Sequence, residues 1–323
     1  MYIVTGGAGM IGSAMIWKLN SLGIVDILVV DHLATSEKWK NLVNRSFAEY
    51  MPREVCCERV RGNTLPGGVK AIFHMGACSA TTERDVDYLF RNNLEYSKTL
   101  AAYALENDIR FINASSAATY GDGPRGFSDN EAELEMFKPL NAYGYSKHLF
   151  DLWAKRTGHL QRLASVKFFN VYGPNEYHKG DMRSVVNKAF AEIAETGRMR
   201  LFASDREEYP DGGQLRDFVY VKDCVDTLWW LAEHPEVNGV FNLGTGRART
   251  WNDLAASLFA AMGREMVVDY IPLPEHLRGK YQYFTQASID KLAAAGCPLP
   301  HHSVETGVAD YVQQYLMQND MFL

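Results

Sequence analysis

The chain has 323 residues, of which 47% are hydrophobic and 22% are charged, and its formal net charge is −6. This length suits one large α/β unit or two domains that share a cleft, with a substantial core. Because charges of both signs are interspersed, the composition excludes an extended basic surface for nucleic acid or for a membrane face.

Targeting and membrane signals are missing from the sequence, and the cysteines are scattered. The chain starts with a strand-like run, and no apolar run is long enough to span a bilayer. The cysteines, which have no metal-ligand spacing, are Cys56, Cys57, Cys78, Cys224 and Cys297. An odd, scattered set fits a reducing compartment, so we expect a cytoplasmic protein.

The first half of the chain alternates between strand-like and helix-like segments. Apolar runs predict strands at 2–5, 26–31, 56–60, 70–77, 110–116 and 163–173. Helical spacing is found at 9–23, 85–106 and from about 141 onward. This alternation predicts an α/β fold with a doubly wound parallel sheet of the Rossmann type.

Beyond residue 173 the loops lengthen, and Gly, Pro and charged residues cluster at 204–216. Further on, we expect a strand at 239–246 and helices at 250–262 and 303–318. We therefore predict a dinucleotide-binding domain made of 1–170 plus about 217–238. The remaining segments, 171–216 and about 239–323, would form a smaller substrate-binding portion.

The segment "TGGAGMIG" places Gly6, Gly9 and Gly12 between a predicted strand and a predicted helix. Glycines in this position let backbone amides approach a pyrophosphate at the positive end of a helix. Asp31 ends the second predicted strand, where an acid accepts hydrogen bonds from an adenosine ribose. The combination predicts a dinucleotide site.

The choice between NAD and NADP stays open at this point. Asp31 favours NAD because a carboxylate repels a 2′-phosphate. The cations His32, Lys38 and Arg53 follow the same strand and can hold that phosphate. Their alternative role is that of ordinary surface charges.

Tyr143 and Lys147, in "YGYSK", are four residues apart on a predicted helix and therefore share a face. A nearby ammonium favours the phenolate and should lower the pKa of the tyrosine. Tyr145 is the competing tyrosine but points elsewhere. Ser116 ends the fifth predicted strand, at the sheet edge where ligands bind in such folds.

The chain contains a glycine loop, a Ser and a Tyr-x-x-x-Lys pair in this order. With this pattern the chain resembles, over nearly its whole length, the extended short-chain dehydrogenase/reductase superfamily. "RDFVYVKD" (216–223) and "FNLGTG" (241–246) are typical of its nucleotide-sugar branch. Within that branch the chain is most similar to the ADP-L-glycero-D-manno-heptose 6-epimerases. The stretches that carry this resemblance are "IFHMGACSATTE", "NNLEYSK", "ASSAATYG", "NVYGPNEYHKG", "RDFVYV", "FNLGTGRA" and "GKYQYFTQA".

This resemblance implies an isomerase that oxidises C6 of an ADP-heptose transiently with tightly bound NADP, for the inner core of lipopolysaccharide. It further implies a homo-oligomer, a homopentamer in that family. The implied catalytic residues are Ser116, Tyr143, Lys147 and Lys179. Implied cofactor contacts, besides the three glycines, are Met10, Ile11, Asp31, His32, Lys38, Arg53, Met75, Gly76, Ala77, Cys78, Ser79, Asn92, Lys147, Val171 and Lys179. Implied substrate contacts are Asn170, Phe202, Ala203, Ser204, Asp205, Arg216 and Tyr281.

Lys179 is the least obvious of these residues, because alone it is a loop lysine beside Gly180. An epimerase that serves both faces of its substrate needs a second acid/base group, and Lys179 can supply it opposite Tyr143. Asp181 and Lys188, also expected at the substrate site, depart from the family pattern, in which a small polar residue and a His are usual. Their effect on substrate preference is left open.

Several residues have structural alternatives. Arg216 pairs with a diphosphate or forms a structural salt bridge. Tyr281 either contacts the substrate or is a packed aromatic side chain. We expect no metal site, and we expect the adjacent His301 and His302 to be solvated.

Two other functions are compatible with the superfamily pattern. One is a UDP-hexose 4-epimerase or a dTDP/GDP-hexose 4,6-dehydratase. Dehydratases usually carry an acid beside the active-site Ser or Thr, whereas Ala117 and Ala118 follow Ser116 here. The other is a catalytically silent dinucleotide-binding regulator, which the intact Ser, Tyr and Lys set disfavours.

Overall fold

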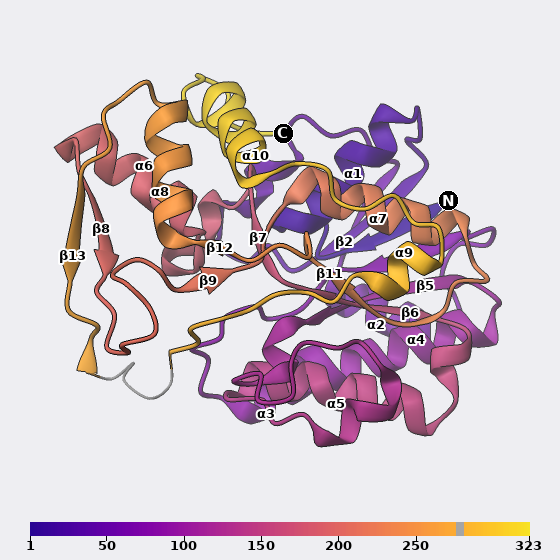
Figure 1. Ribbon diagram of the computed structural model, residues 1–323. Coiled ribbons are helices and arrows are strands. Elements are labelled where there is room, and N and C mark those ends of the chain that lie inside the picture. Colours follow the sequence, from indigo (N-terminus) through magenta and orange to yellow (C-terminus); the bar gives the residue numbers. More distant parts are fainter. Residues whose placement is uncertain (276–280) are drawn as a thin grey trace.

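The computed structural model describes residues 1–275 and 281–323. Its centre is a seven-stranded, entirely parallel sheet in the order β11-β6-β5-β4-β1-β2-β3 (Figure 1). The strands are β1 (Tyr2–Thr5), β2 (Ile27–Asp31), β3 (Glu49–Pro52), β4 (Ala71–His74), β5 (Arg110–Ser116), β6 (Ala164–Phe168) and β11 (Gly239–Leu243). This arrangement confirms the predicted Rossmann-type sheet, whose strand order reverses between β1 and β4.

Helices cover both faces of the sheet, and each interface has its own hydrophobic core. One layer contains α1 (Met10–Ser21) and α7 (Val221–Glu233), with α8 (Trp251–Ala261) and α10 (Val304–Tyr311) beside them. The opposite layer contains α2 (Arg53–Arg61), α3 (Val86–Leu89), α4 (Tyr96–Glu106) and α5 (Ala142–Arg156). Central strands such as β1 and β2 are buried along their whole length because both faces are covered.

Short two-stranded sheets extend the molecule beyond the main sheet. They pair β7 (Asn170–Tyr172) with β10 (Phe218–Tyr220), β9 (Leu215–Arg216) with β12 (Arg249–Thr250), and β8 (Met199–Phe202) with β13 (Val268–Ile271). The remaining described helices are α6 (Val185–Thr196) and α9 (Asp290–Ala294). The 3₁₀ and π turns are η1 (Glu37–Leu42), η2 (Phe90–Glu95), η3 (Ala117–Tyr120), η4 (Glu131–Met136), η5 (His159–Gln161), η6 (Tyr177–Met182) and η8 (Val312–Leu316).

Local sequence explains where the main helices begin and end. The α5 helix starts after Asn141, whose side chain accepts a hydrogen bond from the Gly144 amide at 2.8 Å. The α8 helix starts with a capping box between Thr250 and Asp253. The α1 helix is followed by Gly23 at φ +76°, a left-handed conformation that favours glycine.

The prediction of a strand at 56–60 is wrong, because this segment lies within α2. Cys56 and Val60 are buried and the residues between them are not, which is the spacing of a helix face. The third strand is β3, which ends the sheet and carries exposed Glu49 and Pro52.

Two other long segments are divided in the structure. The run 163–173 forms β6 and then leaves the main sheet at Phe169, so that β7 pairs with β10 instead. The helix expected at 85–106 contains the π turn η2 between α3 and α4, and that expected at 303–318 contains the π turn η8 after α10.

The strand β11 belongs to the main sheet through its pairing with β6. Residues 239–243 therefore do not join the smaller portion, where they were expected. We retain the division into two portions as a proposal, with the last segment of the smaller portion beginning after Leu243.

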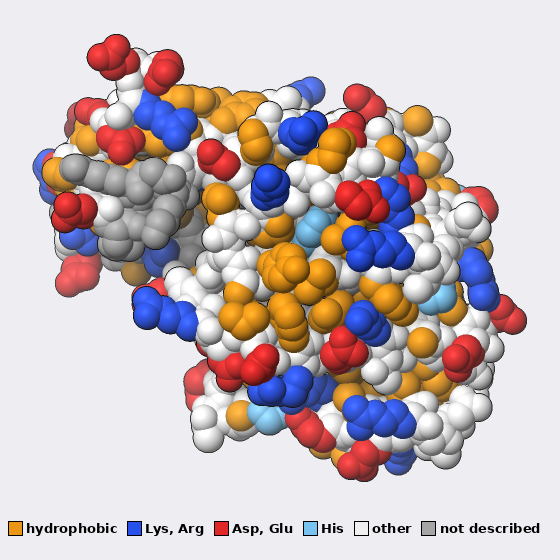
Figure 2. Space-filling model, turned by 90° about the horizontal axis from the view of Figure 1, so that it is seen from below, with side chains coloured by type: hydrophobic (Ala, Val, Ile, Leu, Met, Phe, Trp, Pro, Cys, Tyr) orange, Lys and Arg blue, Asp and Glu red, His pale blue; other side chains and the backbone are white. Residues whose placement is uncertain are grey.

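Among the described residues, the structure contains no helix that is both long enough and apolar enough to traverse a bilayer. The view from below, over α3 and α5, shows hydrophobic side chains gathered near the centre and charges of both signs around them (Figure 2). The large exposed hydrophobic residues of these helices and the segment before α5 are Val86, Tyr88, Met136, Leu140 and Tyr145.

Candidate active site

The glycine loop brings the end of β1 against the loop that follows β4. A side-chain carbon at Gly6 would lie 2.6 Å from the Gly76 backbone, and one at Gly12 would lie 2.1 Å from the Gly6 carbonyl. Gly6 also has φ +63°. Both positions therefore require glycine, because any side chain would separate the loop from its neighbours.

The first turn of α1 offers backbone amides to an anion. Gly9 caps this helix without a side-chain hydrogen bond, and the first turn contains no acid. A cavity of about 520 Å³ opens over this turn and over Asp31, and it extends to Tyr143, Lys147 and Lys179. This cradle fits a dinucleotide pyrophosphate.

Asp31 is buried at the end of β2 and already accepts several hydrogen bonds. Its carboxylate accepts from the Ala8 amide at 2.8 Å, the His32 amide at 2.6 Å and the Lys38 ammonium at 2.6 Å. Lys38 therefore neutralises the acid that was expected to repel a 2′-phosphate.

Arg53 and Asn92 line a smaller cavity of about 100 Å³ that shares Asp31 and Lys38 with the large one. The Arg53 guanidinium donates hydrogen bonds to Asn92 and to Glu54, and His32 lies 3.4 Å from the same Glu54 carboxylate. The expected cations thus lie together beside Asp31.

The other predicted cofactor residues also border cavities. The cavity over the glycine loop is lined by Gly6, Gly9, Met10, Ile11, Gly12, His32, Met75, Gly76, Ala77, Cys78 and Ser79 among others. Val171 lines a third cavity of about 430 Å³ together with Ser116 and Asn170. Tyr143 and Lys179 line both this third cavity and the large one. These two side chains therefore lie where the two cavities meet.

Ser116, Tyr143 and Lys147 come from β5 and α5, which are in contact. The Lys147 ammonium is buried and donates to the Ala114 carbonyl at 2.7 Å, and burial lowers its pKa to about 8. Burial raises the pKa of the Tyr143 phenol, while its hydrogen bond to Ser116 opposes this effect. The expected lowering of the Tyr143 pKa by Lys147 is therefore not found.

Lys179 lies in the irregular turn η6, beside Gly180 at φ +53°. Burial lowers the pKa of its ammonium, and the carboxylate of Glu176 opposes this shift. Glu176 is fully buried and accepts from the Ser184 hydroxyl at 2.6 Å and from the Tyr311 hydroxyl at 3.1 Å. It anchors the segment that carries Lys179.

The predicted substrate residues are spread over more than one cavity. Lys188, Phe202 and Tyr281 line a cavity of about 500 Å³, and Trp251 borders both this cavity and the one with Asn170. Arg216 is buried and lies 5.7 Å and 5.2 Å from the ring centres of Trp251 and Tyr281. Its guanidinium donates to backbone carbonyls of Leu215 and Gln282, so no structural salt bridge is found for it among the described residues.

Other predicted substrate residues do not line these cavities. The Ser204 amide donates to Asp211 in the same loop, and the Asp205 amide donates to the hydroxyl of Tyr283, which is 78 residues away in the chain. Ala203 precedes them and donates its amide to Ile271. Asp181 is exposed, and its carbonyl accepts from Lys188 at 3.2 Å. Gly279 and Lys280 of the "GKYQYFTQA" motif lie outside the described residues.

Two asparagines that the sequence analysis did not single out hold the site together. Asn93, in the π turn η2, binds both backbone groups of Cys78 at 2.8 Å and 3.0 Å and donates to Ser146 at 3.1 Å. Asn41 donates to the Ala8 and Asn175 carbonyls at 2.8 Å and 2.9 Å. A π turn widens the helix without any residue pattern that marks it in the sequence.

His301 is exposed as expected, but His302 is half-buried, and both rings approach the carboxylate of Asp223. The expectation that both histidines are solvated is therefore wrong for His302, while the expectation of no metal site stays a prediction. Asp223, His301 and His302 do not line the cavities described above.

Comparison with known proteins agrees with this geometry. Residues 2–244 match the NAD dependent epimerase/dehydratase family. The chain belongs to that family. It is also 63% identical over its full length, and over the full length of the relative, to an ADP-L-glycero-D-manno-heptose-6-epimerase of Nitratidesulfovibrio vulgaris (strain DP4). A Fusobacterium nucleatum subsp. nucleatum enzyme with the same name is 46% identical, again with complete coverage of both chains.

Two solved epimerase structures have the same fold. The structure of the Helicobacter pylori ADP-L-glycero-D-manno-heptose-6-epimerase has a TM-score of 0.81 and 26% identity, and the match covers 97% of this chain and 95% of that one. A UDP-N-acetylglucosamine 4-epimerase from Methanobrevibacter ruminantium M1 also has a TM-score of 0.81, at 22% identity. The epimerase family member described here is thus an isomerase with a nicotinamide dinucleotide site.

Proposed function

We propose that this epimerase interconverts ADP-D-glycero-D-manno-heptose and ADP-L-glycero-D-manno-heptose by transient oxidation at C6, for lipopolysaccharide inner-core synthesis. The observation that carries the mechanism is that Tyr143 and Lys179 both lie where the cofactor cavity meets the cavity with Ser116 and Asn170. The choice of substrate rests on full-length relatives at 63% and 46% identity that bear this name.

The cofactor in this proposal is tightly bound NADP. Held over the glycine loop, it supplies a hydride acceptor and then a hydride donor, so that no net oxidation remains. Asp31 and the first turn of α1 hold its ribose and pyrophosphate, while Lys38 and Arg53 bind the 2′-phosphate. The Asp31–Lys38 ion pair at 2.6 Å supports NADP over NAD, because it offsets the repulsion by the acid.

Tyr143 and Lys179 exchange the proton of the C6 hydroxyl in the two orientations of the substrate. Burial keeps the Tyr143 phenol protonated, which suits proton donation to a carbonyl oxygen. Burial also favours the neutral amine of Lys179, which suits proton removal from a hydroxyl. In the reverse direction the roles exchange, and Ser116 donates a hydrogen bond to the same oxygen.

Residues of the smaller portion bind the nucleotide part in this proposal. Tyr281, Phe202 and Trp251 offer ring surfaces, and the Arg216 guanidinium lies within about 6 Å of the ring centres of Trp251 and Tyr281, at 5.7 Å and 5.2 Å. Asn170 borders the sugar cavity. A homo-oligomer, a pentamer by resemblance, is part of the proposal and is tested by sedimentation.

A substrate panel with purified protein and no added cofactor tests the proposal. We expect interconversion of the two ADP-heptose epimers, no turnover of UDP-galactose, and release of NADP on denaturation. Turnover of UDP-galactose instead would indicate a hexose 4-epimerase. Release of NAD with intact ADP-heptose turnover would correct only the cofactor.

A further inference from the structure

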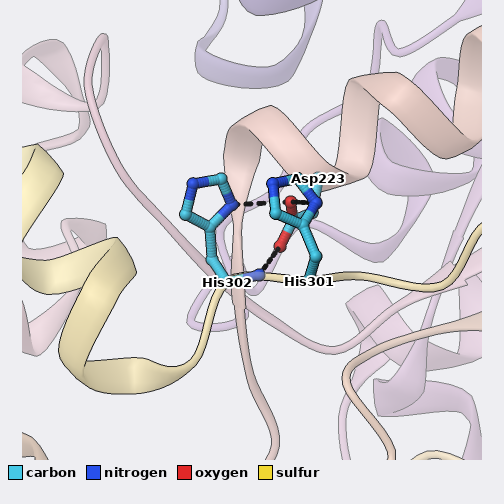
Figure 3. A group of neighbouring side chains, drawn as sticks. All are labelled: Asp223, His301 and His302. Carbon is cyan, nitrogen blue, oxygen red and sulfur yellow. Dashed lines mark hydrogen bonds and ion pairs between the residues drawn. The ribbon is translucent and has the colours of Figure 1, made fainter.

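The carboxylate of Asp223 and the imidazoles of His301 and His302 form a compact cluster on the side of the molecule where α7 begins (Figure 3). Asp223 lies in the first turn of α7, and the two histidines immediately precede the N-cap of α10. His301 Nδ1 is 3.0 Å and His302 Nδ1 is 2.7 Å from the same oxygen, Asp223 Oδ1. The two imidazole rings lie side by side, with centres 4.2 Å apart.

We propose that this cluster is a binding site for a divalent transition-metal ion of the Zn²⁺ type. Its three ligand atoms lie within 4.8 Å of one another, and imidazole nitrogen with carboxylate oxygen is a donor set that suits zinc. Tetrahedral coordination at about 2.0–2.2 Å requires ligand atoms roughly 3.3 Å apart. To accept the ion, the separations of 3.0 Å and 2.7 Å between Asp223 and the histidines need to widen by about 0.3 and 0.6 Å, and the widest ligand separation, within 4.8 Å, needs to narrow.

The anchoring ligand is already held in place. The Asp223 side chain is fully buried, and its second oxygen, Oδ2, accepts a hydrogen bond from the His302 backbone amide at 3.0 Å. The His302 ring packs edge-on against Tyr220, with ring centres 5.1 Å apart. These contacts orient the carboxylate and one imidazole in the way that outer contacts orient metal ligands.

The exposed side chain of His301 leaves the site open to solvent. The His301 side chain is 68% exposed, so an ion can enter from that side and retain water in its fourth position. With neutral imidazoles the site carries one negative charge, which attracts a divalent cation. Protons compete with the ion for the same nitrogen atoms, because a metal ligand must be deprotonated.

Binding at this site joins the start of α7 to the segment that leads into α10. Since the ligands come from segments about 79 residues apart, the folded chain binds the ion and the unfolded chain does not offer the preformed site. The ion therefore stabilises the fold and takes no part in the epimerisation. This inference is independent of the proposed substrate.

Zinc titration of the chelator-stripped full chain by calorimetry tests the site. We expect one Zn²⁺ per chain, and His301→Ala should weaken binding at least about tenfold, the lower limit seen even for loss of an outer contact. His301 is chosen because it is exposed, so its substitution leaves the core intact. His234→Ala, which removes a histidine stacked on Trp230, is the matched control and should retain the wild-type affinity.

A second measurement identifies the ligands if binding is found. Replacement of Zn²⁺ by Co²⁺ should give a visible absorption band of a tetrahedral site in the wild type and in His234→Ala, and His301→Ala should lose it. Equal Zn²⁺ affinity of wild type and His301→Ala, or no binding at all, would overturn the proposal and leave the cluster as two imidazoles in contact with a carboxylate.

Discussion

Lys147 and Lys179 both line the large cavity, but they come from two differently built regions. Lys147 lies on the regular helix α5, where the residue is 3% exposed and its ammonium donates to the Ala114 carbonyl at 2.7 Å. Lys179 lies in an irregular turn beside a left-handed glycine, and its ammonium has no hydrogen bond to any residue in the described ranges 1–275 and 281–323. In the proposed mechanism the regular helix fixes the Lys147 ammonium at one place, whereas the irregular turn presents Lys179 to a substrate with two faces.

Replacement of Tyr143 by Phe tests the regular helix α5 and should have the largest effect on activity. Loss of the phenol removes a positioned acid/base group, so turnover of ADP-heptose should fall by about 10²–10⁴. Tyr145→Phe is the matched control, because Tyr145 lies on the same helix, is 45% exposed and should be dispensable. Equal activity of both variants would remove Tyr143 from the mechanism.

Replacement of Lys179 by Met tests the irregular region. We expect epimerisation to fall by about 10²–10³, within the range for a general acid/base, while the purified chain keeps its dinucleotide. The control is Lys40→Met in the turn η1, where the lysine is paired with Glu37 at the surface. If Lys179→Met only raised KM and left kcat unchanged, Lys179 would be a binding residue, and its proposed acid/base role would be contradicted.

The pH dependence of stability distinguishes the buried ammonium of Lys147 from a surface lysine. Burial lowers its pKa from 10.5 to about 8, so between these values the unfolded chain binds more protons than the folded chain. The free energy of unfolding should therefore rise with pH in this window, by at most about 3 kcal/mol from this residue. Urea unfolding at pH 7.5 and pH 10 should show a smaller rise for Lys147→Met than for the wild type, and equal rises would contradict the assignment.

Lys38 differs from Lys147 and Lys179 because its ammonium is paired with a carboxylate, that of Asp31. Lys38→Met leaves Asp31 without its partner at 2.6 Å, so the acid should again repel a 2′-phosphate. We expect the affinity ratio of NADP to NAD to fall about tenfold, which corresponds to roughly 1.4 kcal/mol. Fluorescence titration with both reduced dinucleotides measures the ratio, and an equal loss for both would exclude Lys38 from phosphate recognition.

The sheet and its glycine loop could be predicted because their signals are local. Short apolar runs, Gly6 and Gly12 at a strand–helix junction, and Asp31 at a strand end are each specified within a few residues. The strand expected at 56–60 failed because "CCERV" is too short to distinguish a strand from a helix by its apolar residues.

Contacts between distant segments could not be predicted in the same way. Asn93 acts through a π turn, and Glu176 acts through Ser184 and Tyr311, which lie on other elements. Likewise, Asp223 and His302 meet only because α7 and the segment before α10 are packed together. The sequence pattern carries no periodicity that marks such pairs.

Epimerisation in heavy water tests the central claim most directly, because transient oxidation at C6 returns the same hydrogen to the sugar. After complete interconversion of the two ADP-heptose epimers, the account predicts that C6 retains its hydrogen and that no carbon of the heptose contains deuterium. Deuterium at C6 would show that the C6 hydrogen exchanges with solvent, and deuterium at C5 or C7 would show enolisation. Either result would contradict the proposed mechanism.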